Sequence, residues 1–213
     1  PKTGELKKGD PLERSVATVN RYIALMQALM TQADKWGMIA ANHVRAIHEV
    51  KLRKEENERI RRLTMAEARS LLDNCDSKLY PIVFLALHTG MRKGEILGLK
   101  WKHIDFQAGF IRLKKTKAGK PRNVPMSSYV KELLHSLPRN IKGGYVFGGR
   151  YNKKPRTDIK NKFPEAVERA GLEDVRFHDL RHTFASNCAM AGANEHELMK
   201  LLGHSSTRMV RRY

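Results

Sequence analysis

The stretch 177–182 reads Phe-His-Asp-Leu-Arg-His and stands at the start of a segment with helical periodicity. His178 and Arg181 are three residues apart, so they share one face of that helix, and His182 lies near the same face. Asp179 lies near the helix N-terminus, where a carboxylate is favourable. Two histidines four residues apart also suggest a metal pair, but the cationic Arg181 stands between them and disfavours a second cation. We therefore expect a cluster of reactive side chains here and no metal.

Two other segments place reactive side chains where helices begin or end. In the stretch 88–95, His-Thr-Gly-Met-Arg-Lys-Gly-Glu, Arg92 begins a helix, where a guanidinium and the free N-terminal amides face a phosphate together. Residues 201–206 read Leu-Leu-Gly-His-Ser-Ser, and Tyr213 follows His204 by nine positions. Taken singly, each has an ordinary alternative: an exposed arginine, a structural histidine and a frayed chain end.

The stretch 114–120 has four lysines at the tip of a predicted hairpin. They can be solvated charges that touch a DNA backbone. A lysine on a hairpin can also reach into a site and donate a proton. Position alone leaves both interpretations open.

Together these groups supply what metal-free cleavage of a phosphodiester requires. A tyrosine hydroxyl is the nucleophile, and arginines bind the non-bridging oxygens and neutralise the charge of the pentacovalent state. A lysine protonates the departing sugar oxygen. A histidine handles the tyrosine proton, which otherwise has a pKa of about 10.

Composition supports a polyanionic partner. The 213 residues contain 41 Lys and Arg against 22 Asp and Glu, a formal net charge of +19, which points first to nucleic acid. The hydrophobic fraction of 41% is enough for a core, no apolar run is long enough to span a bilayer, and the polar N-terminus has no signal-peptide pattern. Cys75 and Cys188 form no disulfide framework. We expect a cytoplasmic, DNA-associated protein with no membrane contact.

The periodicity predicts a mainly α protein with a small antiparallel sheet, an α+β fold. Residues 1–50 are expected to form a small helical domain, 51–63 a basic linker, and 64–213 a larger domain. In the first domain, a helix from Ser15 places its apolar residues on one face, and a second helix covers 42–50. The expected helices of the larger domain are 64–72, 79–88, 92–99, 127–136, 157–170, 179–191 and 194–202, and its strands are 104–106, 110–113 and 122–125.

The sequence resembles the tyrosine recombinases, the phage-integrase family. Four segments carry the resemblance, and their order and spacing match the family over 64–213: residues 88–96, 117–125, 178–186, and 201–206 with Tyr213. Residues 15–50 resemble the later part of the family's core-binding domain. The resemblance implies the tyrosine recombinase catalytic fold, preceded by a partial DNA-binding domain.

The resemblance also implies roles for individual residues. It matches Arg92 and Arg181 to the two transition-state arginines, Lys117 to the general acid, and Tyr213 to the nucleophile. His178 matches a histidine that handles protons and contacts phosphate, and His204 a position held by His or Trp. Glu95 and Asp179 match acidic residues that support the arginines and the histidine. His182 matches a structural histidine. The residues expected to bind DNA are Lys114, Lys115, Lys120 and Arg122.

The implied activity is site-specific recombination of double-stranded DNA. Tyr213 attacks one strand to give a 3′-phosphotyrosyl bond and a free 5′-hydroxyl, which needs no ATP, and the chain has no Gly-x-x-x-x-Gly-Lys-Ser/Thr loop and no expected cofactor. Integration or excision of a phage or mobile element is the expected role, with a homo-oligomer, a tetramer, on paired sites. The alternatives are a DNA-binding regulator that no longer cuts and an enzyme like the type IB topoisomerases.

The family continues beyond the tyrosine, and its tail packs on a neighbouring protomer. Because nothing follows Tyr213 and the start at Pro1 is polar, we expect a truncated piece that is a monomer without DNA. Its Tyr213 should then be mobile or displaced from the arginines and His204.

Overall fold

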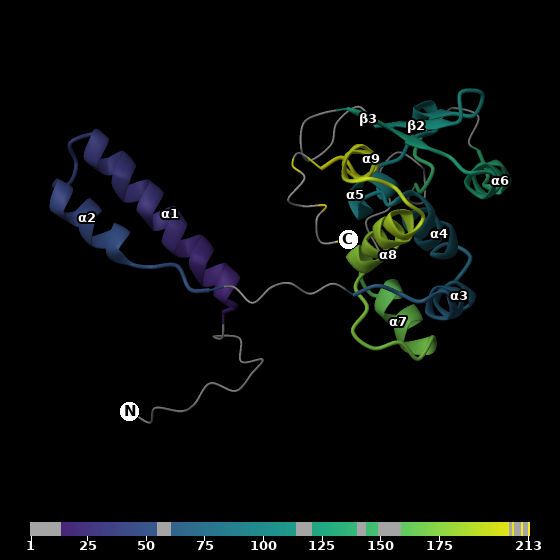
Figure 1. The fold of residues 1–213 in the computed structure, drawn as a ribbon, viewed down its shortest axis with the longest axis horizontal. Coiled ribbons are helices and arrows are strands. Elements are labelled where there is room, and N and C mark those ends of the chain that lie inside the picture. The colour runs from purple at the N-terminus through teal and green to yellow at the C-terminus, as the bar shows by residue number, and fades with distance from the viewer. Residues whose placement is uncertain are drawn as a thin grey trace. The chain divides into compact units, whose positions relative to one another are not determined.

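The structure, a computed structural model, describes residues 14–54, 61–113, 121–139, 144–148, 159–204, 206, 210 and 213. The chain divides into two compact units, Pro1–Arg59 and Ile60–Tyr213 (Figure 1). The boundary falls inside the expected linker 51–63, and a core-binding role for the first unit stays a prediction. The lysine-rich hairpin 114–120 and the first residues of the helix expected at 157–170 lie outside the described residues.

The described part of the first unit is a pair of helices, α1 (Val16–Lys35) and α2 (Ala41–Glu49). The Ser15 side chain caps α1, and Asn20 exchanges two hydrogen bonds with the backbone of Arg53, which ties the chain after α2 to α1. The apolar face expected for the first helix is largely exposed, because α2 covers only part of it. Its most exposed large side chains, Tyr22, Leu25, Met26, Leu29 and Trp36, are 48–69% exposed.

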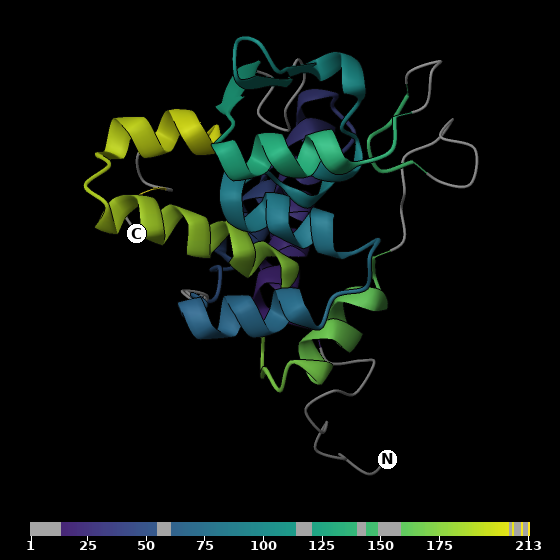
Figure 2. The same cartoon turned by 90° about the vertical axis from the view of Figure 1, so that its right-hand side faces the viewer.

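The described part of the second unit is mainly helical. Its helices are α3 (Met65–Asp73), α4 (Tyr80–Thr89), α5 (Lys93–Leu97), α6 (Ser128–Ser136), α7 (Lys162–Arg169), α8 (Phe177–Met190) and α9 (Glu195–Leu202), with a 3₁₀ turn at Trp101–His103. The apolar α4 is buried along most of its length and packs on α8, and Figures 1 and 2 show the two helices side by side. A capping box begins α3, because the side chains of Thr64 and Glu67 each accept the backbone N–H of the other residue.

The sheet has the expected three antiparallel strands in the order β1 (Ile104–Asp105), β2 (Phe110–Leu113), β3 (Arg122–Pro125). Ile111 pairs with Ile104 on one side and with Val124 on the other. Burial alternates along β2, so that one face of the sheet packs on the core and the other faces solvent. The register also pairs Leu113 with Arg122 at the end from which the 114–120 segment departs.

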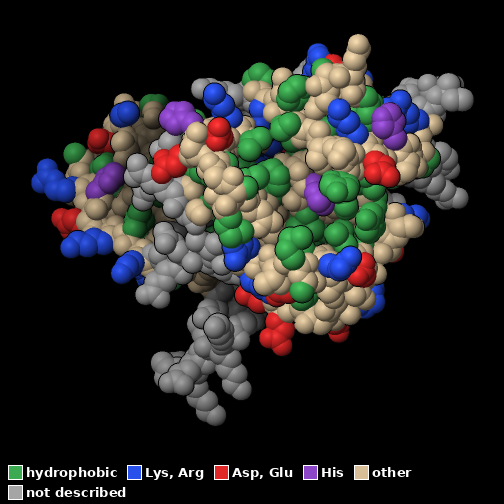
Figure 3. All heavy atoms as spheres, turned by 45° about the vertical axis from the view of Figure 1, so that its right-hand side comes forward, with side chains coloured by type: hydrophobic (Ala, Val, Ile, Leu, Met, Phe, Trp, Pro, Cys, Tyr) green, Lys and Arg blue, Asp and Glu red, His purple; other side chains and the backbone are tan. Residues whose placement is uncertain are grey.

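An apolar groove opens on one face of this unit between α3, α4 and α8. Figure 3 shows hydrophobic side chains gathered on that face. The groove has a volume of about 610 Å³ and is lined by residues that include Leu63, Met65, Leu72, Leu87 and Phe184. No helix in the described ranges is both long enough and apolar enough to span a membrane.

Candidate active site at the ends of α4 and α9

The site forms where the C-terminal ends of two helices meet. Gly90 caps the C-terminal end of α4, and Gly203 caps that of α9. Both glycines have the left-handed backbone conformation, with φ of 60° and 64°. A side chain is disfavoured at this φ. At Gly90 there is also no room for one, because an added Cβ would come within 2.4 Å of the Phe184 ring. The two helix ends therefore bring free backbone carbonyls, the negative ends of two helix dipoles, into one small region.

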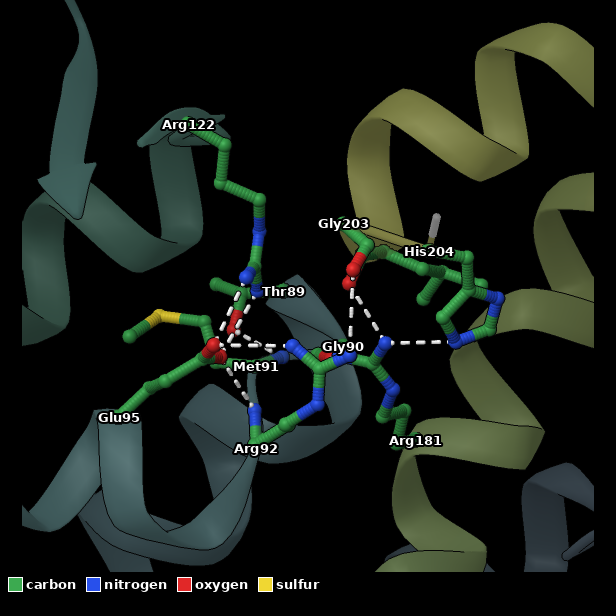
Figure 4. Close-up of polar contacts among 10 residues, drawn as sticks. Thr89, Gly90, Met91, Arg92, Glu95, Arg122, Arg181, Gly203 and His204 are labelled. Atoms are coloured by element: carbon green, nitrogen blue, oxygen red, sulfur yellow. Dashed lines mark hydrogen bonds and ion pairs between the residues drawn. The ribbon is translucent and has the colours of Figure 1, made fainter. Parts of the chain in front are cut away.

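Arg181 from α8 occupies this region and is only 2% exposed. Its Nη1 donates to the Gly90 carbonyl at 2.7 Å, and its Nη2 donates to the Leu202 carbonyl at 2.6 Å (Figure 4). Burial, together with the nearby charges of Arg92 and Arg122, lowers the pKa of Arg181 to about 10. The guanidinium is thus a cation at neutral pH, and it donates its hydrogen bonds to two backbone carbonyls and His204 rather than to a carboxylate.

His204 receives its orientation from Arg181. The Nη2 of Arg181 lies 2.9 Å from Nε2 of His204. Because arginine only donates hydrogen bonds, His204 Nε2 is the acceptor and the ring proton lies on Nδ1. His204, the histidine of the Leu-Gly-His segment, therefore lies beside Arg181 as a neutral ring.

Arg92 completes the arginine pair from the other side. Its Nη2 donates to the Gly203 carbonyl at 3.1 Å, so each arginine is held by the end of a helix far from it in sequence. Its backbone N–H and its Nη1 both donate to Glu95, at 2.8 and 3.1 Å. Glu95 is thus in direct contact with Arg92, and its role as a support of that arginine stays a prediction.

Arg122 was expected to bind DNA, whereas in the structure its guanidinium pairs with Glu95. It makes a bidentate pair with Glu95, with both Nη–Oε distances at 2.8 Å, and its side chain is only 7% exposed (Figure 4). A guanidinium that is buried and paired in this way does not face a DNA backbone. It packs so closely on Gly203 that an added Cβ there would lie 2.8 Å from Arg122 Cδ.

Glu95 is the shared counter-ion of the site. Burial raises its pKa, but the hydrogen bonds from Arg122 and from the Arg92 backbone outweigh burial and bring the pKa below its usual value. One ionised carboxylate then faces three guanidinium groups, those of Arg92, Arg122 and Arg181. The site carries excess positive charge, which suits a phosphodiester.

Tyr213 and the histidines of α8 lie together. Figures 1 and 2 both place the C-terminal end against α8, and the Tyr213 hydroxyl is 2.7 Å from Nδ1 of His182. The His178 ring lies edge-on to that of His182, with centroids 4.8 Å apart, and His178 is exposed. A negative charge on the Tyr213 oxygen raises the pKa of Arg181, so a tyrosinate at this position and the guanidinium stabilise each other. His182, expected to be purely structural, instead contacts the hydroxyl directly, and displacement of Tyr213 from the arginines stays a prediction.

Asp179 supports the helix. Its carboxylate accepts the backbone N–H of Arg176 at 2.8 Å, and α8 therefore begins at Phe177, two residues earlier than expected. This start includes His178 in the first turn of the helix. The role of Asp179 that the structure displays is helix capping, and it positions His178 through the backbone.

Four of the expected site residues lie outside the described part of the chain: Lys114, Lys115, Lys117 and Lys120. The segment that carries these lysines is followed directly by β3, whose first residue, Arg122, binds Glu95 in the site. Among the described residues, no three His, Cys, Asp or Glu side chains are grouped so as to hold a metal ion.

Comparison with known proteins gives a consistent result. Residues 61–213 match the profile of the Phage integrase family. The chain is 36% identical to the shufflon-specific DNA recombinase of Escherichia coli, over 100% of the chain and 53% of that protein. It is 32% identical to the integrase of Salmonella phage P22, over 95% of the chain and 55% of that protein. The chain thus spans about half the length of these curated relatives.

Solved structures agree on the fold. The catalytic domain of bacteriophage HP1 integrase is 33% identical and superposes with a TM-score of 0.59 over 73% of the chain and 87% of that structure. A lambda integrase (75–356) dimer bound to a COC′ core site superposes with a TM-score of 0.74 over 91% of the chain and 74% of that structure, at 22% identity. The mainly helical fold with a small antiparallel sheet, expected from the sequence, is thereby confirmed.

Proposed function

The chain belongs to the phage integrase family, the tyrosine recombinases, and from that premise we propose that it cuts and rejoins DNA strands at specific sites through a 3′-phosphotyrosyl intermediate. One observation carries the proposal. Arg92, Arg181 and His204 converge at the ends of α4 and α9, and the Tyr213 hydroxyl is bound on α8, the helix that carries Arg181.

The two arginines bind the scissile phosphate in this proposal. Arginine has five N–H donors. Within the described residues Arg181 uses three of them, and the other two can bind phosphate oxygens. Arg92 has two such contacts and keeps three. Because both side chains are already held in place, little reorganisation is needed when negative charge grows on the phosphate.

The reaction exchanges one phosphoester for another. Tyr213 Oη bonds to phosphorus as the bond to the 5′-oxygen breaks, and Lys117 protonates that leaving oxygen. His204 and His178 contact the phosphate. The phosphotyrosyl ester keeps the energy of the original bond, so a 5′-hydroxyl from a partner strand reverses the step without ATP.

The DNA partner and the assembly are part of the same proposal. The lambda integrase structure is a dimer on a core site, and we propose that this protein also acts as an oligomer, a tetramer, on paired DNA sites. The biological role that we propose is integration or excision of a phage or mobile element, which the similarity to the phage P22 integrase supports.

Trapping of the covalent adduct tests the proposal. The protein is incubated with a pool of random-sequence duplexes nicked near their centre, so that a short 5′-hydroxyl fragment leaves after cleavage and religation stops. We expect a DNA adduct on a denaturing gel, with the modified peptide ending at Tyr213, and an enriched site sequence in the captured DNA. DNA binding without any adduct would favour the non-cleaving regulator.

Replacement of the nucleophile gives the matching control. Tyr213→Phe removes only the hydroxyl, while affinity comes from many phosphate contacts. We expect adduct formation to disappear and DNA binding to change less than about twofold, measured by gel shift on the enriched site. An adduct formed by this variant would show that another residue is the nucleophile.

A further inference from the structure

A buried histidine faces the hydroxyl that the proposed reaction must deprotonate. His182 is 7% exposed, and its Nδ1 lies 2.7 Å from Tyr213 Oη, within direct hydrogen-bond reach. The two rings are tilted, with centroids 5.5 Å apart, so the contact joins the imidazole edge to the hydroxyl. The family resemblance assigns this histidine no chemical role.

We infer that His182 is a further catalytic residue, the base that accepts the proton of Tyr213 during strand cleavage. The inference rests on the proposed function, because it takes Tyr213 as the nucleophile. The neutral tautomer with a bare Nδ1 accepts the hydroxyl proton along the hydrogen bond already formed.

The step balances without any other reactant. As the bond from Tyr213 Oη to phosphorus forms, the O–H bond breaks and the proton moves to His182 Nδ1, while the 5′-oxygen leaves with a proton from the general acid. In the return step the 5′-hydroxyl attacks and gives its proton back to the deprotonated general acid, the tyrosine oxygen leaves, and the imidazolium returns the proton to that oxygen. A free phenol has a pKa of about 10 and a free imidazole about 6.5, so a base held on the hydroxyl is needed near neutral pH.

The other two histidines near the site are worse placed for this proton. His204 Nε2 already accepts a hydrogen bond from Arg181, which occupies the lone pair a base would use. His178 is exposed, and its ring lies edge-on to that of His182. The Nδ1 of His182, by contrast, lies 2.7 Å from the hydroxyl oxygen.

Helix α8 carries both the arginine that binds the phosphate and the histidine that accepts the proton. Arg181 and His182 are consecutive on α8, so their side chains leave the helix about 100° apart. Arg181 points to the ends of α4 and α9, and His182 to Tyr213. One rigid element thus carries both the phosphate-binding cation and the base.

Single-turnover cleavage of two substrates tests the inference. The wild type and His182→Asn act on the enriched nicked site, either with its normal phosphodiester or with sulfur in place of the bridging 5′-oxygen. Asparagine keeps a hydrogen-bonding group near the position of Nδ1 but is not a base. Because a thiolate leaves without a proton, the sulfur substrate removes the need for the general acid and leaves the need for the base unchanged.

We expect His182→Asn to slow cleavage by about 10²–10⁴-fold on both substrates, with DNA binding unchanged. The control His196→Asn, an exposed histidine on α9, should cleave at the wild-type rate on both. Cleavage by His182→Asn within threefold of wild type, or recovery on the sulfur substrate, would overturn the inference.

A second variant covers the case in which His182→Asn also loses DNA binding. His182→Ala leaves space for a free imidazole, and added imidazole should restore cleavage if the missing group is a base. Absence of restoration would count against the inference. Failure of the proposed function looks different, because the wild type itself would then form no adduct at Tyr213.

Discussion

At the scale of single residues, the arginines of the site depend on partners that differ in kind. Arg181 is held by backbone carbonyls, whereas Arg92 and Arg122 share the single carboxylate of Glu95. The difference matters, because carbonyls at helix ends cannot be titrated or moved without unfolding the helix. Arg181 is therefore the most rigidly placed charge of the site.

Arg181→Lys tests whether that geometry matters beyond charge. A lysine has one nitrogen and cannot bond two carbonyls, His204 and a phosphate in the planar arrangement of a guanidinium. We expect cleavage of the nicked site to fall by about 10²–10³-fold with DNA binding nearly retained. A cleavage rate close to wild type would mean that a point charge is sufficient.

Arg122→Met tests the buried pair with Glu95. Removal of one partner leaves a buried carboxylate with less compensation, and we expect a loss of about 3 kcal/mol in the free energy of unfolding, measured by urea denaturation. Cleavage should also fall, because Glu95 positions Arg92. The matched control is Arg112→Met on the same sheet. Arg112 pairs with Asp105 while its side chain is 58% exposed, so its loss should cost about 0–1 kcal/mol and leave cleavage unchanged.

The double variant Arg122→Met with Glu95→Leu separates stability from positioning. Replacement of both partners by apolar groups removes the unpaired charge, so stability should largely return. Cleavage should stay low, because Arg92 has lost its carboxylate. Recovery of both properties would mean that the pair serves folding alone.

At the scale of elements, the site is built from helix ends rather than helix faces. The left-handed glycines that stop α4 and α9 turn the last carbonyls toward Arg181 and Arg92. The Asp179 cap sets the start of α8 and hence places His178 in its first turn. Helix boundaries, which often vary without consequence, are here part of the active site.

Gly203→Ala tests this arrangement against Gly171→Ala. Both glycines have a similar φ, 64° and 65°, so both substitutions carry a similar backbone cost of about 1 kcal/mol. An added Cβ at Gly171 meets nothing, whereas at Gly203 it lies 2.8 Å from Arg122. We expect similar small losses in thermal stability but a loss of cleavage at least tenfold larger for Gly203→Ala. Equal cleavage by the two variants would show that Arg122 moves aside without effect.

At the scale of the whole molecule, charge is the dominant property. The formal net charge of +19 exceeds what the arginines of the site contribute, so most of it must act elsewhere. The segments 51–62 and 114–120 are the predicted backbone contacts. Both segments are rich in Lys and Arg, which bind the phosphates of a duplex without reading its sequence.

Binding should accordingly depend steeply on salt. If these segments neutralise roughly 6–10 phosphates, affinity should fall by about 10³–10⁵-fold between 50 and 200 mM salt. Substitution of Lys51, Arg53 and Lys54 by Gln should reduce the slope of log affinity against log salt by about 0.9 per lost contact. A flat salt titration of the wild type, measured by fluorescence anisotropy, would show that the charge is not a DNA-binding surface.

The sequence by itself determined the local features of this protein. Apolar periodicity, a capping box, glycines and short alternating strands predict the helices and the sheet, since these signals act over a few residues. The segments with Arg92, His178, Arg181, His204 and Tyr213 were identified through their resemblance to the family, which fixes the order and spacing of these residues.

Only the tertiary structure decided which side chains meet. Arg122 and Glu95 are 27 positions apart on a strand and a helix, and no periodicity links them, so a basic residue beside a lysine-rich hairpin was expected to bind DNA. His182 and Tyr213 are 31 positions apart, and their contact depends on how the chain returns to α8 after α9. Hydrogen bonds between distant segments are selected by packing of the whole unit. The partners of a charged group therefore become known when the fold is known.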